Sequence, residues 1–382
     1  MRAAVLHGFG DLRIEEVPDP LPGPHDVVLD VACVQLSVTE CMLIAGEPVA
    51  LHHQLAAALA TGPVRFGGHE FAGVVRAVGS AARDVAIHDI EVGAQVTAVE
   101  TIDCGSCGPC RRGRPDACLA PEFIGFTRPG ALAEQVVVPA SAVVPVPPGV
   151  SAAAAAAIQP LAGALHAHAT AAVRPGETML IIGAGVMGLL ALQVARRGNA
   201  GLVAISGRSL AKLDLARRFG ADLVLDATGG PEAVLSAVHE ATGGVGVDVV
   251  IETAGGSPAV GLAGTDTLDL AARCARRGGR IVLVSVLPDR APAPLGLLRE
   301  RGIALLHPRS GAGGYSPTAD VFEQALRLVA RGDVDVESLI THRLAGIAEA
   351  PKAVEITRNK AAYGAINPAQ LDLTSGGRPW HC

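Results

Sequence analysis

The feature that most restricts the fold is a glycine-rich segment, Gly183-Ala184-Gly185-Val186-Met187-Gly188, with the spacing G-x-G-x-x-G. It directly follows an apolar run, 179–182, and directly precedes a helical pattern. Glycines at these positions let the backbone turn tightly and approach a pyrophosphate, which free N–H groups at the helix N-terminus can bind. The segment therefore predicts a dinucleotide site rather than a plain strand-to-helix turn, with contacts from Gly183, Gly185, Val186, Met187 and Gly188.

The chain around this motif alternates between strand and helix patterns. Short apolar runs predict strands, and longer runs with helical periodicity predict helices. We expect strands at 177–182, 202–206, 223–225, 247–251 and 280–284, and helices at 189–197, 210–219, 231–241 and 266–277. Strands that alternate with helices are typical of a doubly wound parallel sheet, so an α/β fold is predicted for this part of the chain.

The first 150 residues have a different pattern. Valine-rich runs are separated by Gly/Pro turns, and many short strands with such turns predict a barrel or a sandwich. The expected strands lie at 26–31, 73–78, 95–99 and 134–138. Ser151 begins an alanine-rich segment and is a candidate N-cap for a helix. After about residue 310 we expect another helix, at 319–331, and short mixed elements.

The strand that follows the glycine motif predicts which dinucleotide binds. In an NAD site, an Asp or Glu at the end of this strand, about 20 residues on, holds the ribose 2′-hydroxyl. Here the strand ends in Ser206-Gly207-Arg208-Ser209, and Lys212 follows one turn later. An acid would repel a 2′-phosphate, whereas Arg208 can pair with one. We therefore predict NADP(H), held with the help of Gly207, Arg208, Ser209 and Lys212; the alternative is that Arg208 is a solvated loop charge.

Four of the eight cysteines are clustered. Cys104, Cys107, Cys110 and Cys118 have the spacing C-x2-C-x2-C-x7-C, and Gly and Pro between them permit sharp turns. In a reducing compartment, such clustering favours a metal over disulfides. Four thiolates in a tetrahedral arrangement form a closed structural zinc site, which holds a loop and performs no chemistry. An iron–sulfur cluster, which also uses four thiolates, and disulfides remain as alternatives.

The composition excludes several classes of function. Lys plus Arg is 31 and Asp plus Glu is 37, a net charge of −6, which argues against a nucleic-acid or anionic-membrane partner. The most apolar stretch, 150–173, contains Gln159, Pro160, His166 and His168, so we do not expect it to span a membrane. The first 16 residues lack the pattern of a signal peptide. We therefore expect a cytoplasmic protein.

These features together resemble the zinc-containing medium-chain dehydrogenase/reductase family, which includes alcohol, sorbitol and threonine dehydrogenases. Further matches are Gly68-His69-Glu70-Phe71-Ala72-Gly73, Pro160-Leu161-Ala162-Gly163-Ala164-Leu165-His166-Ala167 and Phe219-Gly220-Ala221-Asp222. The resemblance covers nearly the whole chain. It implies a GroES-like β-rich catalytic domain at 1–155 with a four-cysteine zinc lobe at 104–118, a Rossmann domain at 156–305, and a C-terminal segment, 306–382, that returns to the catalytic domain. It also implies a homodimer or homotetramer.

The sequence departs from this family where the catalytic zinc is held. The family's ligands are a cysteine in a G-I-C-G-[ST]-D-x-H-like stretch, the histidine of G-H-E, and a Glu, Asp or Cys just before P-L. This sequence has Gln35-Leu36-Ser37-Val38-Thr39-Glu40-Cys41-Met42 in the first stretch and Gln159 before Pro160-Leu161. Ser37 and Gln159 thus replace two anionic ligands with poor ones. The catalytic zinc is expected to be lost, although Cys41 or Cys33 could restore it if the loop differs; otherwise both are small buried hydrophobes.

The resemblance also implies which catalytic residues remain. Thr39 keeps the hydroxyl that relays the substrate proton in the family, and Glu40 replaces an aspartate. Without a metal, His69 and Glu70 are expected to form a hydrogen-bonded acid/base pair in which His69 donates a proton to the acceptor. The alternative for His69 is a buried structural histidine.

Three functions fit these observations. The first, which we favour, is an NADPH-dependent oxidoreductase that transfers hydride to a small molecule with an activated C=C, C=N or C=O group, because no metal would polarise the acceptor. The second is a zinc-dependent alcohol or polyol dehydrogenase with an altered ligand set. The third is a non-catalytic NADPH-binding protein on the same scaffold, against which the intact glycine motif and Thr39 argue.

Overall fold

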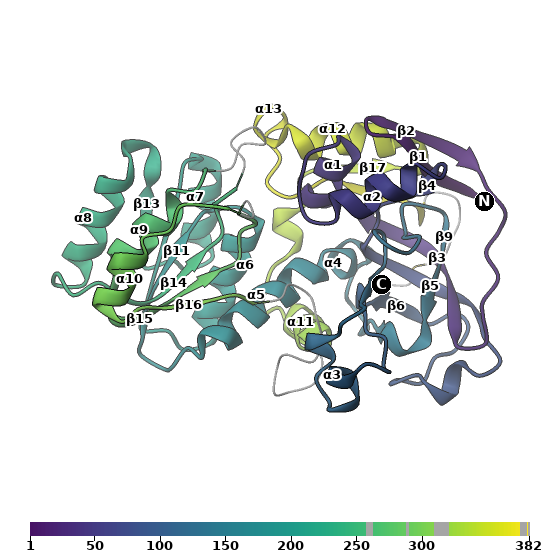
Figure 1. The fold of residues 1–382 in the computed structure, drawn as a ribbon, viewed down its shortest axis with the longest axis horizontal. Helices are drawn as coiled ribbons and strands as arrows, with labels where there is room; N and C mark the ends of the chain where they lie inside the picture. The colour runs from purple at the N-terminus through teal and green to yellow at the C-terminus, as the bar shows by residue number, and fades with distance from the viewer. Residues whose placement is uncertain (257–262, 288–289, 309–320, 375–379, 381–382) are drawn as a thin grey trace. The chain divides into compact units, whose positions relative to one another are not determined.

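The structure is a computed structural model that describes residues 1–256, 263–287, 290–308, 321–374 and 380. The chain divides into two compact units, Met1–Gln159 with Gly311–Cys382, and Pro160–Ser310 (Figure 1). Each unit has a hydrophobic core of its own.

The first unit is rich in β-strands. Its main sheet has the order β10-β6-β5-β3-β18-β17, and β9 also pairs with β3. These strands are β3 (Asp26–Gln35), β5 (Glu70–Val78), β6 (Gln95–Ala98), β9 (Gln135–Pro139), β10 (Val143–Pro145), β17 (Arg343–Ala345) and β18 (Gln370–Asp372). A second sheet has the order β2-β1-β4, and β7 pairs with β8. Their bounds are β1 (Arg2–Gly8), β2 (Asp11–Glu16), β4 (Val64–Arg65), β7 (Thr101–Ile102) and β8 (Glu122–Phe123).

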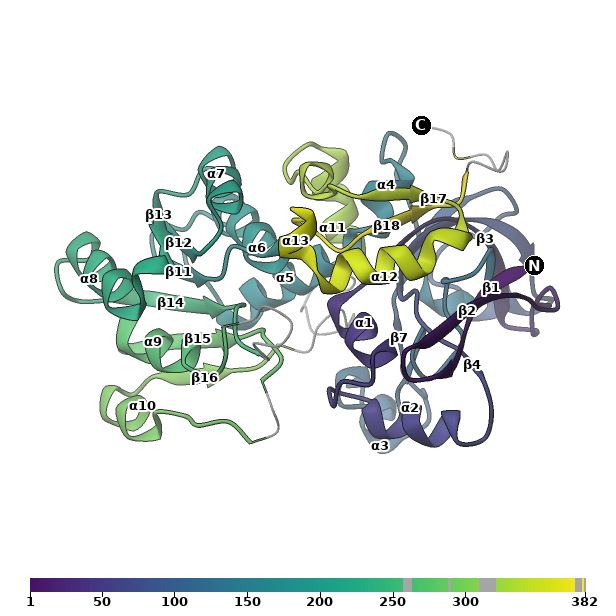
Figure 2. The same ribbon diagram turned by 90° about the horizontal axis from the view of Figure 1, so that it is seen from above.

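The long strand β3 organises this unit. It pairs antiparallel with β5, β9 and β18, so the last strand of the chain lies against the third. Its sequence, DVVLDVACVQ, is a nearly continuous apolar run and is buried at most positions. Helix α4 contacts β3 and β5, and a strand that is covered on both faces requires apolar residues at successive positions. Figures 1 and 2 show C-terminal elements, in yellow, beside N-terminal strands, in purple.

Short helices connect these strands. They are α1 (Val38–Ile44), α2 (His52–Leu59), α3 (Gly108–Arg111), α4 (Ala152–Ala156), α11 (Val321–Ala330), α12 (Ala350–Arg358) and α13 (Lys360–Tyr363). The predicted N-cap is confirmed, because the Ser151 side chain accepts a hydrogen bond from the Ala154 N–H at 3.1 Å. Helix α11 confirms most of the helix predicted at 319–331, of which 319–320 lie outside the described residues.

The second unit is a doubly wound parallel sheet. Its strand order, β13-β12-β11-β14-β15-β16, reverses direction beside β11, as in the Rossmann fold. The strands are β11 (Thr178–Ile182), β12 (Leu202–Gly207), β13 (Leu223–Asp226), β14 (Val247–Glu252), β15 (Ala275–Leu283) and β16 (Ala304–Leu306). The predicted parallel α/β sheet is thus confirmed.

Helices cover both faces of this sheet. Figure 2 shows α6 and α7 on one side of the strands and α9 and α10 on the other, where α8 packs against α9. The helices are α5 (Ile158–Ala171), α6 (Val186–Arg197), α7 (Leu210–Arg218), α8 (Pro231–Ala241), α9 (Thr267–Cys274) and α10 (Leu295–Arg301). In the described part of the chain, no helix is long and apolar enough to cross a membrane.

One predicted boundary is wrong. The helix expected at 266–277 ends at Cys274, and the next residues begin β15. Ala275 pairs with Val247 of β14, and the register then shifts by a bulge before Arg280 pairs with Val249. Ala275, Arg276 and Arg277 are good helix formers, but pairing with a buried neighbouring strand outweighs a propensity of a few tenths of a kcal/mol per residue.

Candidate functional site

A buried histidine lies at the start of β5. His69 is 7% exposed, and its ring lies 4.7 Å, centroid to centroid, from the ring of Phe126. Gly67 and Gly68 precede it with φ values of +94° and +80°. A Cβ at Gly68 would lie 2.1 Å from the backbone nitrogen of Leu132, so only glycine fits there. This turn places the imidazole inside the first unit rather than on its surface.

Helix α1 supplies the partner of this histidine. The Ser37 hydroxyl caps the helix by accepting a hydrogen bond from the Glu40 N–H at 3.1 Å. Glu40 is fully buried, and its Oε2 accepts hydrogen bonds from His69 Nδ1 at 2.9 Å and from the Gly68 N–H at 3.1 Å. Because Nδ1 donates to Glu40, His69 Nε2 is the ring nitrogen that remains for chemistry.

Two further carboxyl groups belong to this site. Glu70 Oε1 lies 3.6 Å from His69 Nε2, and Glu70 Oε2 accepts a hydrogen bond from the Gln35 side chain. Glu100 is buried and accepts a hydrogen bond from Gln159 Nε2 at 3.4 Å. Three glutamates therefore surround one imidazole in a region largely closed to water, where electrostatic interactions are strong.

This environment raises the pKa of both His69 and Glu70. Burial alone would lower the pKa of His69, but the hydrogen bond and charge of Glu40, followed by Glu70 and Glu100, raise it to about 9. Burial raises the pKa of Glu70 to about 8, against the opposing effects of His69 and Gln35. Burial also raises the pKa of Glu100. At neutral pH the site therefore holds an imidazolium and a protonated carboxyl group, and both can donate a proton.

The predicted catalytic residues are partly brought together. His69 and Glu70 are adjacent in space, as expected, but the imidazole bonds to Glu40 and not directly to Glu70. Thr39 lies half-buried on α1, next to Glu40 in sequence, and the described hydrogen bonds of His69 and Glu70 do not involve it. The sequence reasoning missed Gln35 and Glu100. Gln35 could have been found from the antiparallel pairing of β3 with β5, and Glu100 from its position two residues after β6.

The glycine motif of the second unit forms the turn between β11 and α6. Gly183 has φ +108°, and a Cβ there would lie 2.8 Å from Thr253 Oγ1. A Cβ at Gly188 would lie 1.7 Å from the carbonyl oxygen of Gly183, so helix and strand approach closely. Gly185 is the N-cap of α6, without a side-chain cap, and nothing lies within 4 Å of the position of its Cβ. Val186 and Met187 begin the helix, so their N–H groups lie at its N-terminus, which favours an anion.

The end of β12 has no room for an acidic side chain. Gly207 is its last residue, and a Cβ there would lie 2.7 Å from the Cβ of Ala184. Arg208 follows on the surface, and Ser209 is the N-cap residue of α7. Lys212 lies in the first turn of α7, where burial lowers its pKa. The residues expected to choose between NAD and NADP thus follow the carboxyl end of the strand next to the glycine turn.

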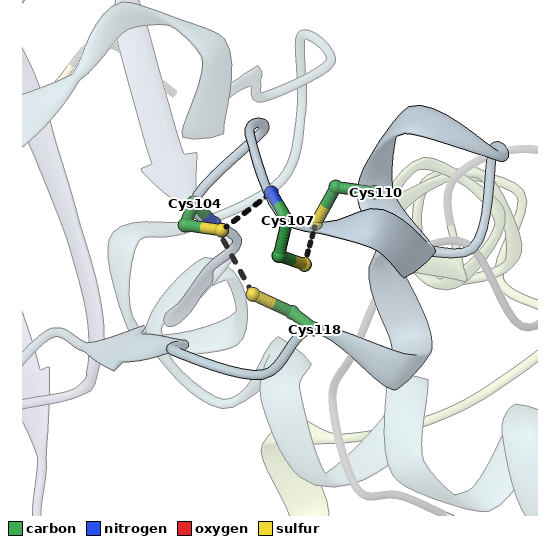
Figure 3. Close-up of side chains that lie close together, drawn as sticks. All are labelled: Cys104, Cys107, Cys110 and Cys118. Atoms are coloured by element: carbon green, nitrogen blue, oxygen red, sulfur yellow. Dashed lines mark hydrogen bonds between the residues drawn. The ribbon is translucent and has the colours of Figure 1, made fainter.

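The four clustered cysteines converge on one point. Figure 3 shows their side chains directed toward one another, and their Sγ atoms lie within 4.8 Å of each other. Backbone N–H groups of Cys104 and Cys107 donate to the sulfurs of Cys118 and Cys104 at 3.3 and 3.4 Å. Such bonds favour thiolates, and those from Ser106 and Cys107 lower the pKa of Cys104 to about 6. All four are free cysteines, and their arrangement fits the tetrahedral zinc site predicted from their spacing.

Comparisons with known proteins match both units. The family model "Alcohol dehydrogenase GroES-like domain" matches residues 23–148, and "Zinc-binding dehydrogenase" matches residues 185–331. An L-threonine 3-dehydrogenase of Rhizobium etli (strain CIAT 652) is 32% identical over 337 residues, 87% of this chain and 88% of that protein. The sorbitol dehydrogenase of Bacillus subtilis (strain 168) is 28% identical over 89% of each chain.

A solved structure extends this likeness to the fold. A zinc-binding dehydrogenase of Sinorhizobium meliloti 1021, described as putative and bound to NADP, has a TM-score of 0.80 and 30% identity over 97% of this chain and 99% of that one. The chain belongs to the zinc-type medium-chain dehydrogenase/reductase family. It is an oxidoreductase of that family with a GroES-like domain and a Rossmann domain, as the sequence predicted.

The family's catalytic zinc does not fit the residues present at its site. The hydroxyl of Ser37 is the N-cap of α1, and the amide of Gln159 donates to Glu100. Cys33 and Cys41 are fully buried, and burial raises the pKa of both thiols, of Cys33 to about 12. Within the described residues, the four-cysteine cluster is the only group of three or more His, Cys, Asp and Glu side chains close enough to hold a metal ion. The GroES-like domain thus has a cysteine cluster that could hold a metal, and Ser37 and Gln159 do not offer the anionic donors of the family's catalytic site.

Proposed function

We propose that the chain is an NADPH-dependent reductase that transfers hydride to a small molecule with an activated C=C, C=N or C=O group, without a catalytic zinc. This proposal rests on the buried His69. Its Nδ1 donates a hydrogen bond to Glu40, and its pKa is raised to about 9. It provides a proton donor at neutral pH in a site whose metal-ligand positions are taken by Ser37 and Gln159.

The choice of NADPH rests on the end of β12. No acidic side chain fits at Gly207, and the next residues offer Arg208, Ser209 and Lys212. These features support recognition of a 2′-phosphate. The Sinorhizobium meliloti structure has NADP bound, which supports the same choice of coenzyme. The turn from Gly183 to Gly188 would hold the pyrophosphate over Gly185. When bound, the coenzyme supplies the hydride.

His69 supplies the proton that balances the hydride. Glu40 fixes the ring and stabilises the imidazolium, so Nε2–H donates to the oxygen, nitrogen or carbon of the acceptor that becomes negative. Loss of the proton leaves a neutral imidazole, which solvent protonates again. Thr39 is the proposed hydroxyl of this relay. Glu70, protonated near neutral pH, places no full negative charge beside Nε2 that would compete for the proton.

The lack of a Lewis acid restricts the acceptor. A metal ion stabilises the developing negative charge of a simple ketone by several kcal/mol, and an imidazolium gives a smaller, proton-coupled stabilisation. We therefore propose acceptors that are already electrophilic: conjugated alkenes, imines or iminium ions, and activated carbonyls. The four cysteines would hold one structural zinc per chain.

A second candidate is a zinc-dependent alcohol or polyol dehydrogenase with an altered ligand set. It is favoured by one observation: His69 Nε2 and Glu70 Oε1 lie 3.6 Å apart, close enough to bind one ion together. The two candidates differ in the zinc content of the chain and in the substrates that they accept.

The zinc content per chain, measured by elemental analysis after purification without a chelator, distinguishes them. We expect one zinc, kept in His69→Gln and lost in Cys107→Ser, which lowers Tm by at least about 5 °C. NADPH oxidation should then occur with enones or imines and be lost in His69→Gln. Two zincs, one of which is lost in His69→Gln, together with turnover of alcohols or polyols, would establish the second candidate.

Organisation and assembly complete the proposal. We propose domains at 1–155, 156–305 and 306–382, in a cytoplasmic homodimer or homotetramer. Strand β16 supports self-association, because among the described residues it pairs on one side only, with β15. Light scattering at several concentrations gives the oligomeric mass directly, and a concentration-independent monomer would contradict the assembly.

A further inference from the structure

Three buried polar side chains lie side by side on neighbouring strands. Gln370 of β18 is the register partner of Gln35 of β3, and Gln35 is the register partner of Glu70 of β5. Residues directly opposite each other on antiparallel strands point to the same face of the sheet. Gln370 and Gln35 are fully buried, and Glu70 is 4% exposed. The row therefore connects the C-terminal strand to the acid/base site.

The hydrogen bonds of these side chains fix the orientation of the Gln35 amide. Gln35 Oε1 accepts from Asn367 Nδ2 at 2.8 Å and from Gln370 Nε2 at 3.1 Å. Gln370 is itself fixed, because Nε2 also donates to the Ala153 carbonyl at 2.9 Å. If the amide of Gln35 turned over, the fixed Nε2 of Gln370 would face an NH2 group. The Gln35 amide nitrogen must therefore point at Glu70, and it donates to Oε2.

This contact requires a side chain at position 35. By the family resemblance, Gln35 aligns with the first glycine of the G-I-C-G stretch, and a glycine has no side chain that could reach Glu70. The bond from Gln35 occupies Oε2 of Glu70, and Oε1 is left 3.6 Å from His69 Nε2. A carboxyl group turned to bind a metal ion would have to give up this bond or share it.

We propose that Gln35 is a positioning residue that replaces a metal bond: it holds Glu70 at a fixed distance from His69 Nε2 and stabilises its carboxyl group by a hydrogen bond. Gln370 keeps the amide in the correct orientation, so the C-terminal segment helps to set the geometry of the acid/base pair. The catalytic consequence rests on the proposed function, whereas the effect on Glu70 does not.

The first test compares two glutamine substitutions in the same sheet. Gln35→Leu removes the donor to Glu70, and the matched control, Gln135→Leu, removes a buried amide on β9 that donates to Asp30 instead. For NADPH-dependent reduction, we expect Gln35→Leu to lower kcat by roughly tenfold or more, with KM for NADPH unchanged. Gln135→Leu should leave kcat unchanged.

The second test does not depend on activity. Infrared difference spectra report the carbonyl stretch of protonated carboxyl groups, and the wild type minus Glu70→Gln assigns the contribution of Glu70. Loss of the donor in Gln35→Leu should move this band to higher frequency at pH 7, because the carbonyl oxygen loses a hydrogen bond. Gln35→Glu is the second variant: it keeps an acceptor for Asn367 and Gln370, and it should change the same band.

The outcomes distinguish the positioning role of Gln35 from the proposed reaction. The measurements use the variants, Gln35→Leu or Gln35→Glu, that fold. If both the Glu70 band and kcat are unchanged in them, the positioning role is overturned, even in an active enzyme. A shifted band in a wild-type chain that reduces none of the acceptors would support the role of Gln35 and refute the proposed reaction. A shifted band with a fall in kcat, absent from Gln135→Leu, supports both.

Discussion

Single residues decide what the site can do, because the same side chain behaves differently in different surroundings. His69 is cationic at neutral pH since the buried Glu40 bonds to its Nδ1, whereas burial lowers the pKa of His166. The hydroxyl of Ser37 is engaged as a helix cap. Chemistry at this scale depends on partners that are distant in sequence.

Arg208→Ala should weaken NADPH binding. If Arg208 pairs with the 2′-phosphate, its loss removes charge-assisted hydrogen bonds, and we expect Kd for NADPH to rise about 10- to 100-fold with little change for NADH. Fluorescence titration of both coenzymes measures this. Arg218→Ala, at the exposed last turn of α7, is the control. Equal affinities for the two coenzymes in the parent protein would refute the assignment.

Glu70→Gln should flatten the dependence of stability on pH. The folded pKa of Glu70 is raised from 4.5 to about 8, chiefly by burial, so the folded chain keeps a proton that the unfolded chain releases. This contribution is fully present below pH 4.5 and is lost as pH rises to about 8, by up to about 1.4 kcal/mol per pH unit. Urea unfolding at several pH values between 5 and 8 measures the slope.

His69 also makes the free energy of unfolding fall as pH rises, but over a higher pH range. Its folded pKa is raised from 6.5 to about 9, so its contribution is lost as pH rises between these values and remains in Glu70→Gln. Glu122→Gln, on the exposed strand β8, should keep the wild-type slope. An equal slope in Glu70→Gln and in the wild type would show that Glu70 is ionised in the folded chain.

At the scale of elements, caps and tight turns place the functional groups. Helix α1 begins at a serine cap and thereby brings Glu40 to the imidazole, and the glycine turn before β5 brings the imidazole to Glu40. In the second unit, the turn between β11 and α6 leaves helix N–H groups at the carboxyl end of the sheet. In each case the local backbone, not a long element, sets the position.

Ser37→Ala tests whether Ser37 is a helix cap or a metal ligand. Removal of an N-cap hydroxyl costs about 1 kcal/mol of unfolding free energy, and Ser151→Ala, which removes the cap of α4, should cost a similar amount. The zinc content should be the same in both variants and in the wild type. Loss of zinc in Ser37→Ala alone would show that the hydroxyl binds the metal.

At the scale of the whole molecule, the chemistry is divided between the two units. The acid/base cluster belongs to Met1–Gln159 with Gly311–Cys382, and the glycine turn belongs to Pro160–Ser310. The first unit is not continuous in sequence, since β18 and α12 complete its sheet and core. Its integrity therefore depends on the last part of the chain.

Truncation should show this dependence. A chain that ends at residue 366 lacks β18 and leaves one side of β3 near Gln35 unpaired, so we expect Tm to fall by at least about 10 °C or the chain to fail to fold. A chain that ends at residue 374 keeps β18 and should stay within about 3 °C of the full chain. Thermal unfolding followed by circular dichroism compares them. Equal losses in both chains would contradict the role of β18.

Much of the fold could be predicted because it depends on local pattern. The apolar run 179–182, the glycines after it and the alternation of strands and helices specify a parallel sheet, since each is a property of neighbouring residues. The exception, at Ala275–Arg277, shows the limit: pairing with β14 is a long-range contact that local propensity does not contain.

The candidate site shows the same division. Motif spacing located the four cysteines and the end of β12, and the family resemblance located His69 and Glu70, because neighbouring residues carry those signals. The tertiary structure alone brought Glu100, Asn367 and Gln370 to that region; for Gln370 the reason is that β3 pairs with strands from both ends of the chain. The charge of His69 was also decided by the tertiary structure, since burial and Glu40 act through space and not through the order of the residues.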